Sequence, residues 1–302
     1  MMEYIVENPT DELSELEKKQ RMIDRAPFDG LRIKDTSTLE LVQFRSTCDL
    51  CHKSRKFFCY TCYHPVIPSL YFPRVKLPIK IDIIKHPREI DGKSTAVHAA
   101  ILAPTDVKIY TYPDFPEILN KEEVRRKTIL VFPCKDNTKN ISVEDLFSRK
   151  VEKCGASVET PETVFPIRRA IFIDSTWQQT RSIYKDQRLR ELRCVVLKSR
   201  ISQFWRHQKK SPRWYLATIE AIHQFLVELH TCALGVDEDY NKCDALVTSY
   251  LDRNIINSDN IEIMQKYNGQ YDNLLYFFKF MYDKIHSMYN HNKLQAYKRP
   301  LA

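Results

Sequence analysis

Four cysteines near the start of the chain have the spacing of a metal site. They form two C-x-x-C pairs separated by seven residues, Cys48 with Cys51 and Cys59 with Cys62. Each pair can turn both thiolates toward one ion, and two pairs complete the tetrahedral set of four sulfurs that suits Zn²⁺. Because the protein fills all four ligand positions, we expect a structural zinc ion. Disulfides and a redox dithiol are the alternatives, although an intracellular chain disfavours the first and a redox motif needs only one such pair.

Cations and aromatic rings surround the cysteine pairs. This combination is typical of modules that contact RNA, because basic side chains bind phosphates and aromatic rings stack on unpaired bases. A solvent-exposed rim around a zinc module would have the same composition, so both interpretations stay open. The residues concerned are Arg45, His52, Lys53, Arg55, Lys56, Phe57, Phe58, Tyr60, Tyr63 and His64.

Two apolar runs in the middle of the chain end in polar residues. The run in 169–178 delivers Asp174 to its carboxyl end, and the run in 128–135 is stopped by Pro133. Open α/β sheets form their binding sites at the carboxyl ends of strands, so both segments are candidates for a site. Asp174 could alternatively cap the helix that follows it.

A third candidate segment, 211–221, is a loop that enters a long helix. It carries Thr218 and Glu220 near the start of that helix. These two residues could contact a ligand, or they could simply complement the helix dipole.

The elements that must position these residues alternate along the chain. Short apolar runs are followed by helical patterns, which predicts an α/β fold with a mainly parallel sheet. We expect strands at 79–84, 107–112, 128–132, 169–174 and 193–197, and helices at 96–102, 142–148, 177–184 and 216–231.

Glycine is scarce, with five residues in 302, and no G-x-G sequence exists in the chain. A Rossmann dinucleotide loop, a P-loop and a G-x-S-x-G nucleophile elbow all need closely spaced glycines, so none of them is possible here. A nucleotide-like cofactor would therefore bind without a glycine cradle.

The two ends differ from the middle of the chain. Residues 10–25 predict an exposed helix, acidic and then basic, which we expect to be a peripheral arm. Beyond 236 the pattern is helical, with candidates at 237–253 and 260–289, and the aromatic residues of the second are expected to pack in the core. The expected parts are an acidic helical leader (1–44), a zinc module (45–68), an α/β domain (69–236) and a helical C-terminal extension (237–302).

The net charge of +8 is unevenly distributed. Residues 1–24 hold seven acidic and three basic residues, a balance of −4, which leaves +12 for 25–302 and favours a nucleic-acid partner. The stretch 198–214 has no acidic residue and contains three aromatic rings, a pattern typical of contact with RNA loops, although a solvated run of charge is the alternative. Its basic residues are Lys198, Arg200, Arg206, Lys209, Lys210 and Arg213.

Membrane and secretion signals are missing from the sequence. No apolar run approaches the roughly 18 residues of a membrane span, and the first residues lack the basic and apolar regions of a signal peptide. We expect an intracellular protein, in the nucleus rather than the cytosol, with no membrane association and no obligatory protein partner.

The sequence Asp174-Ser-Thr-Trp177 resembles the D-x-T-W signature of the DTW-domain family, the tRNA-uridine aminocarboxypropyltransferases. The match spans roughly 45–235 and departs from the family at Ala217, where a serine is usual. Each motif is weak alone, but five in one order are specific. The other landmarks are the paired C-x-x-C, H-P-R-E at 86–89 with K-S-T at 93–95, L-V-F-P at 130–133 and L-A-T-I-E-A at 216–221.

The resemblance implies a SPOUT-like, knotted α/β fold that binds S-adenosylmethionine in loops at strand ends, with 69–236 as the catalytic domain. Family members transfer the 3-amino-3-carboxypropyl group of this cofactor to N3 of a tRNA uridine, giving acp3U and methylthioadenosine. Because uridine N3–H is only weakly acidic, a base should remove its proton as the new bond forms. Asp174 is the candidate base, and burial beside Trp177 would raise its pKa and so improve it; alternatively it only orients the substrate.

The remaining site residues follow from the matched motifs. Thr176 and Trp177 join Asp174 in the catalytic set, although Trp177 could stack on a base or serve only in packing. His86 and Lys93 join the basic residues expected to bind tRNA. The residues expected to bind the cofactor are Leu130, Val131, Phe132, Pro133, Ser175, Leu216, Thr218 and Glu220.

Two other functions fit parts of the same sequence. One is a SPOUT-type RNA methyltransferase, which would transfer the methyl group of the same cofactor. The other is a non-catalytic zinc-containing protein that binds RNA and no cofactor.

Overall fold

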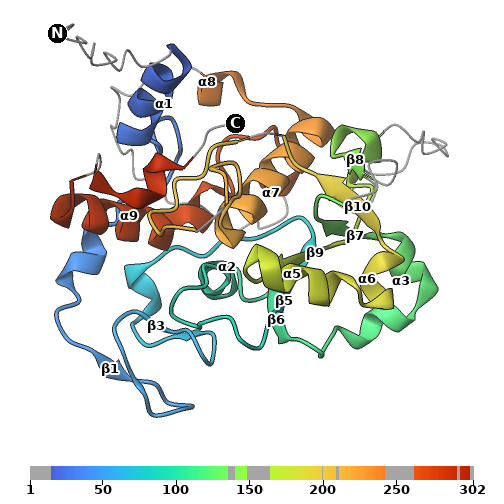
Figure 1. The fold of residues 1–302 in the computed structure, drawn as a ribbon, viewed down its shortest axis with the longest axis horizontal. Coiled ribbons are helices and arrows are strands. Elements are labelled where there is room, and N and C mark those ends of the chain that lie inside the picture. The colour runs from blue at the N-terminus through green and yellow to red at the C-terminus, as the bar shows by residue number, and fades with distance from the viewer. Residues whose placement is uncertain are drawn as a thin grey trace, which may run out of the picture.

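Six strands form one parallel sheet in the spatial order β6-β5-β9-β7-β10-β8 (Figure 1). These strands are β5 (Lys80–Lys85), β6 (Val107–Thr111), β7 (Thr128–Val131), β8 (Asn140–Ser142), β9 (Arg169–Asp174) and β10 (Arg193–Val196). The inner strands are buried on both faces, as expected for a parallel sheet between layers of helices. The computed structural model describes residues 15–134, 140–147, 164–198, 200–208, 211–241, 262–290 and 293–299.

Helices cover both faces of the sheet. The described part of the chain contains the helices α1 (Glu15–Arg25), α2 (Ala96–Leu102), α3 (Glu122–Arg126), α5 (Trp177–Tyr184), α6 (Gln187–Arg190), α7 (Thr218–Leu234), α8 (Glu238–Asn241) and α9 (Tyr276–Met288). Ile83 and Phe172 point to the face covered by α2 and α7, whereas Ile84 and Ile171 pack with α5 and α6 on the opposite face. Successive strand residues therefore meet apolar layers on both sides, which is why the strands lack a polar face. No described helix is long and apolar enough to cross a lipid bilayer.

Short strands and turns complete the secondary structure. In the cysteine segment β1 pairs with β2, and β3 with β4, both antiparallel. These four strands are β1 (Ser46–Thr47), β2 (Ser54–Arg55), β3 (Phe58–Cys59) and β4 (His64–Pro65). The single 3-10 turns include η1 (Ser37–Leu41), η2 (Ser69–Tyr71), η3 (Glu117–Asn120), η5 (Glu144–Leu146), η6 (Glu262–Met264), η7 (Asp272–Leu275) and η9 (Gln295–Lys298).

One apolar core runs through all four parts expected from the sequence. Leu39 of the leader, Phe57 of the cysteine segment, Ile83 of the sheet and Phe277 of the C-terminal part belong to the same buried cluster. The rings of Phe58 and Phe277 lie 4.9 Å apart between centroids, so the cysteine segment packs directly on α9. The expectation that the C-terminal aromatic residues are core residues is confirmed, and packing is continuous across the sequence boundaries at 44, 68 and 236.

The helix expected at 142–148 is wrong in its described part, where strand β8 is followed by η5. Asp145 Oδ2 accepts hydrogen bonds from the amide and the hydroxyl of Ser142 at 2.7 and 2.8 Å, which ends the strand in a tight turn. β8 contains a single apolar residue, Ile141, so its sequence carries no alternating pattern that would have revealed an edge strand.

The helix expected at 260–289 is also wrong as one element, because its described part consists of η6, a turn, η7 and α9. Gly269, with φ of 97°, lies in the turn, and a bridge between Val236 and Tyr267 ties this turn to the end of α7. Of the helix expected at 237–253, α8 is observed, and the rest lies outside the described residues.

The N-terminal helix exists as α1 but is not a peripheral arm. Asp24, near its end, is 2% exposed and is bound to Arg213, 189 residues further along the chain. In Figure 1 α1 lies beside the C-terminal elements, and both ends of the described chain therefore belong to the body of the fold.

Candidate active site

Asp174 is the last residue of β9 and lies at the carboxyl edge of the sheet. It is 4% exposed. Ser94, just before α2, donates its hydroxyl to Oδ2 at 2.7 Å, and Thr218, the first residue of α7, donates its hydroxyl to Oδ1 at 2.6 Å. The carboxylate is thus fixed by one neutral hydroxyl on each oxygen, from two different elements.

Burial sets the electrostatics of this carboxylate. Removal from water raises the pKa of Asp174, and the hydrogen bonds from Thr218 and Ser94 and the positive charge of Lys85 offset only part of that effect. Lys85 ends the neighbouring strand β5 in register with Asp174, but its ammonium group pairs with Asp91. A carboxylate with a raised pKa is a stronger base than an ordinary aspartate, which suits it to accept a proton.

Two adjoining pockets lie at the carboxyl edge of the sheet, and Asp174 lines the first of them. The first, which we call the aspartate pocket, has a volume of about 550 Å³, and its lining includes Glu89, Lys93, Asp174, Thr176, Arg206 and His207. The second, which we call the apolar pocket, has a volume of about 490 Å³, and its lining includes Val131, Phe132, Pro133, Val196, Leu197 and Tyr215. The wall that both pockets share includes Ser175, Trp177, Leu216 and Thr218.

Aromatic rings form part of that wall. Trp177 lies against Tyr215 with 4.0 Å between ring centroids, and its other neighbour, Phe132, lies at 6.3 Å in a stacked arrangement. Both neighbours line the apolar pocket, so a planar heterocycle bound there would meet aromatic faces.

The structure brings most of the expected catalytic and cofactor residues to this pair of pockets, with two exceptions. Leu130 is fully buried in the apolar cluster beneath α5 and α6 and lines neither pocket. Glu220 is 3% exposed, and its carboxylate accepts hydrogen bonds from the Ser202 hydroxyl and from the amides of Gln203 and Ala217 at 2.7 to 2.8 Å. Its observed contacts are with the chain itself, so the structure gives it a positioning role.

The basic residues expected to bind RNA lie in different places. Lys93 and Arg206 line the aspartate pocket, and Lys198 and Arg200 line the apolar pocket. His86 lies directly after β5 and lines neither pocket, and Lys209 and Lys210 fall outside the described residues.

Arg213 is a correction to the expected RNA contacts. The guanidinium is 2% exposed and bound to Asp24, so it faces the protein interior instead of a ligand. The sequence around Arg213 holds no acidic residue, because its acidic partner, Asp24, lies 189 residues earlier in the chain.

Ser94 lies inside the matched K-S-T motif at 93–95 but is not among the site residues expected from the sequence. Its hydroxyl reaches Asp174 across a separation of 80 residues. The neighbouring Thr95 hydroxyl accepts a hydrogen bond from the Ile219 amide at 3.2 Å, which joins the start of α2 to the start of α7. The motif was the available signal, and it marks the residues that hold Asp174 in place.

The four cysteines lie together in the geometry of a metal site. Their Sγ atoms all lie within 4.8 Å of one another, and all four cysteines are free thiols. Each pair closes a turn in which the amide after the second cysteine donates to the carbonyl of the first at 2.8 Å, and the two residues that donate, His52 and Tyr63, have φ of 55° and 56°. Sulfurs at the corners of a tetrahedral zinc site with Zn–S bonds of about 2.3 Å stand about 3.8 Å apart, so the observed cluster fits Zn²⁺.

The fold and the site define an α/β protein with a parallel sheet and, at its carboxyl edge, a buried aspartate that lines one of two adjoining pockets. The sequence model of the DTW domain matches residues 56–286, and the chain belongs to this family. Its relatives include proteins named tRNA-uridine aminocarboxypropyltransferase 1. Those of Xenopus tropicalis (40% identity, 84% of each chain), Mus musculus (41%, covering 80% of this chain and 77% of the relative) and Homo sapiens (40%, covering 86% and 84%) are three examples. A comparison with solved structures found no significant match.

Proposed function

We propose that this protein is a tRNA-uridine aminocarboxypropyltransferase, which transfers the 3-amino-3-carboxypropyl group of S-adenosylmethionine to N3 of a uridine in tRNA. The observation that carries the proposal is the buried Asp174 of the D-S-T-W sequence, which lines the aspartate pocket next to the wall shared with the apolar pocket, in a chain about 40% identical to enzymes of that name. Two pockets with a common wall match a reaction that joins two substrates.

The apolar pocket is the proposed cofactor site. Its aromatic rings Phe132 and Tyr215 suit the adenine ring. The residues at the carboxyl ends of strands β7 and β10 also line this pocket. S-adenosylmethionine supplies an electrophilic carbon bonded to a positively charged sulfur. Thr218 and Trp177 would flank the transfer, because both belong to the wall that the two pockets share.

The aspartate pocket is the proposed site of the target uridine. Lys93 and Arg206 at its lining suit the flanking phosphates, and Asp174 faces the base. When uridine N3 forms the new C–N bond and the C–S bond breaks with its pair going to sulfur, the Asp174 carboxylate would accept the N3 proton. Ser94 and Thr218 hold that carboxylate toward the reacting nitrogen throughout.

The finer features of the fold belong to the same proposal. We take the sheet to be SPOUT-like and knotted, as the resemblance to the DTW-domain family implies. In its strand order, β9 lies between β5 and β7, and β10 lies between β7 and β8. We also propose that Cys48, Cys51, Cys59 and Cys62 hold a structural zinc ion. Metal analysis of freshly purified protein tests this point: about one equivalent of zinc is expected, and well below half an equivalent would contradict it.

The reaction is tested with unmodified tRNA and cofactor labelled separately in the methyl carbon and the carboxyl carbon. We expect label in RNA only from the carboxyl carbon, together with released methylthioadenosine. Label only from the methyl carbon would identify an RNA methyltransferase instead. Binding of tRNA with neither label transferred and no cofactor bound would identify a non-catalytic RNA-binding protein.

A further inference from the structure

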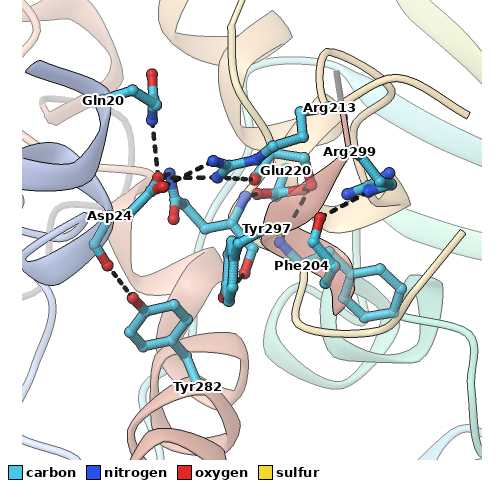
Figure 2. Close-up of polar contacts among 11 residues, drawn as sticks. Gln20, Asp24, Phe204, Arg213, Glu220, Tyr282, Tyr297 and Arg299 are labelled. Atoms are coloured by element: carbon cyan, nitrogen blue, oxygen red, sulfur yellow. Dashed lines mark hydrogen bonds and ion pairs between the residues drawn. The ribbon is translucent and has the colours of Figure 1, made fainter. Parts of the chain in front are cut away.

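We propose that a buried ion pair between Asp24 and Arg213 positions the segment that lines the aspartate pocket, so that both ends of the chain determine how tightly the RNA substrate binds. This inference rests on the proposed function. We call the segment 202–213 the pocket loop; its residues 202–208 and 211–213 are described. Figure 2 shows the contacts at its base, where α1, α9 and the C-terminal residues meet.

The pocket loop leaves and rejoins the body of the protein at one point. The Ser202 amide donates to the Arg213 carbonyl at 2.8 Å, and Glu220 of α7 holds the Ser202 hydroxyl and the Gln203 amide. Beyond this base the loop reaches the aspartate pocket, whose lining includes Arg206, His207 and Gln208.

The N-terminal helix α1 holds the base of the pocket loop in place through a bidentate ion pair. Arg213 Nη1 and Nη2 donate to the two carboxylate oxygens of Asp24 at 2.6 and 2.8 Å, and both residues are 2% exposed. Gln20 adds a hydrogen bond to Asp24 at 2.8 Å (Figure 2), and Gln203 adds another at 3.0 Å. A planar guanidinium bound by both nitrogens fixes orientation as well as distance, which a buried apolar contact of similar size would not do.

The C-terminal residues hold the same base from the other side. The Tyr297 hydroxyl donates to the Gln203 carbonyl at 3.1 Å, and Arg299 Nη1 donates to the Pro212 carbonyl at 3.3 Å. Tyr282 of α9 donates to the Asp24 carbonyl (Figure 2). Asp24, Tyr297 and Arg299 all lie outside residues 56–286, the part that matches the DTW domain, so segments beyond that match complete its pocket.

The pocket loop carries groups that an RNA would meet. Arg206 and His207 are exposed, and Arg206 Nη2 also donates to the Gly92 carbonyl at 3.3 Å, next to Lys93 of the pocket lining. A shift at the loop base would move these groups relative to Asp174. The apolar pocket is lined by none of the described residues of the pocket loop, although Arg200, Trp214 and Tyr215, which flank the loop, line it. Cofactor binding should therefore respond less than RNA binding to such a shift.

The test compares two variants of different severity with a matched control. Asp24→Asn removes the charge and Tyr297→Phe removes one hydroxyl from the loop base. Tyr276→Phe is the control, because Tyr276, like Tyr297, donates its hydroxyl to a backbone carbonyl, that of Tyr71 at 2.8 Å, away from the pocket loop. Steady-state rates are measured against tRNA and S-adenosylmethionine separately, at a temperature where each variant is folded.

We expect Asp24→Asn to raise the KM for tRNA about tenfold and Tyr297→Phe about threefold, with the KM for the cofactor and kcat within about twofold of wild type. Tyr276→Phe should leave all three constants unchanged. A lower kcat with both KM values unchanged would indicate only a loss of folded enzyme and would overturn the positioning role. An equal rise of the tRNA KM in Tyr276→Phe would overturn it as well.

Failure of the proposed function gives a different result. If wild type bound tRNA but transferred no group, the reaction assignment would fall, whereas the ratio of tRNA dissociation constants between Asp24→Asn and wild type would still decide the role of the pocket loop. A ratio near one would reject it.

Discussion

Two aspartates, Asp24 and Asp174, are equally buried in this protein and have opposite surroundings. Asp24 faces the guanidinium of Arg213, and although burial raises its pKa, the hydrogen bonds and charge of its partners outweigh burial and lower the pKa below its ordinary value. Asp174 has a hydroxyl on each oxygen, and burial raises its pKa. The paired carboxylate holds the chain together, and the unpaired one keeps a lone pair and a raised pKa available for chemistry.

The largest expected effect is on activity. Asp174→Asn should lower the single-turnover rate of transfer at least about a thousandfold, because the amide cannot accept the N3 proton. Its affinity for tRNA should stay near that of wild type, measured by filter binding. If the variant retained most of the rate, Asp174 would not be the catalytic base, and the functional difference between the two aspartates would be wrong.

The next effect is on stability and concerns the other aspartate. Asp24→Asn should lower the free energy of unfolding by about 3 kcal/mol, because it leaves Arg213 buried without a counter-charge. Asp174→Asn should change it by less than about 1 kcal/mol, since its partners are neutral. Urea unfolding of both variants provides the measurement, and equal losses would mean that the two sites do not differ in kind.

Acid should separate the same two variants from wild type in opposite directions. The pKa of Asp24 is lowered on folding, so its stabilising contribution is present above the unfolded pKa and is lost as pH falls through the folded one. The pKa of Asp174 is raised, so wild type should gain stability relative to Asp174→Asn as pH falls through that value. Urea unfolding at several acidic pH values tests both signs, and a shared sign would contradict the assignment.

The smallest effect is expected at the hydroxyls that hold Asp174. Thr218→Val keeps the side-chain shape and removes one hydrogen bond from Oδ1, so the rate of transfer should fall about fivefold through poorer orientation. Thr128→Val is the matched control, because the Thr128 hydroxyl is also buried, donates to the Val124 carbonyl at 2.7 Å instead of the carboxylate, and lines neither pocket. A larger loss in the control than in Thr218→Val would place the sensitive contact elsewhere.

Local sequence patterns predicted the parts of the fold that depend on local chemistry. The apolar runs located five of the six strands of the sheet and put Asp174 at a strand end, and the cysteine spacing brought the four thiols to one point. β8 was not predicted, because a short edge strand with one apolar residue shows no alternation of apolar and polar residues. The spacing of residues also says little about partners: Ser94 and Asp174 are 80 residues apart, and Asp24 and Arg213 are 189 apart. The burial of Arg213, and hence the role of both chain ends, is visible only once the chain is folded.

The pH dependence of single-turnover transfer tests most directly whether the unpaired carboxylate is the base. If it is, the rate should rise with pH to a plateau, with a midpoint above the ordinary aspartate value of about 3.9, because burial raises the pKa of Asp174. The midpoint should move to higher pH in Thr218→Val, which loses a hydrogen bond that stabilises the charged form. A rate independent of pH down to about pH 4, or a midpoint that Thr218→Val leaves in place, would contradict the account.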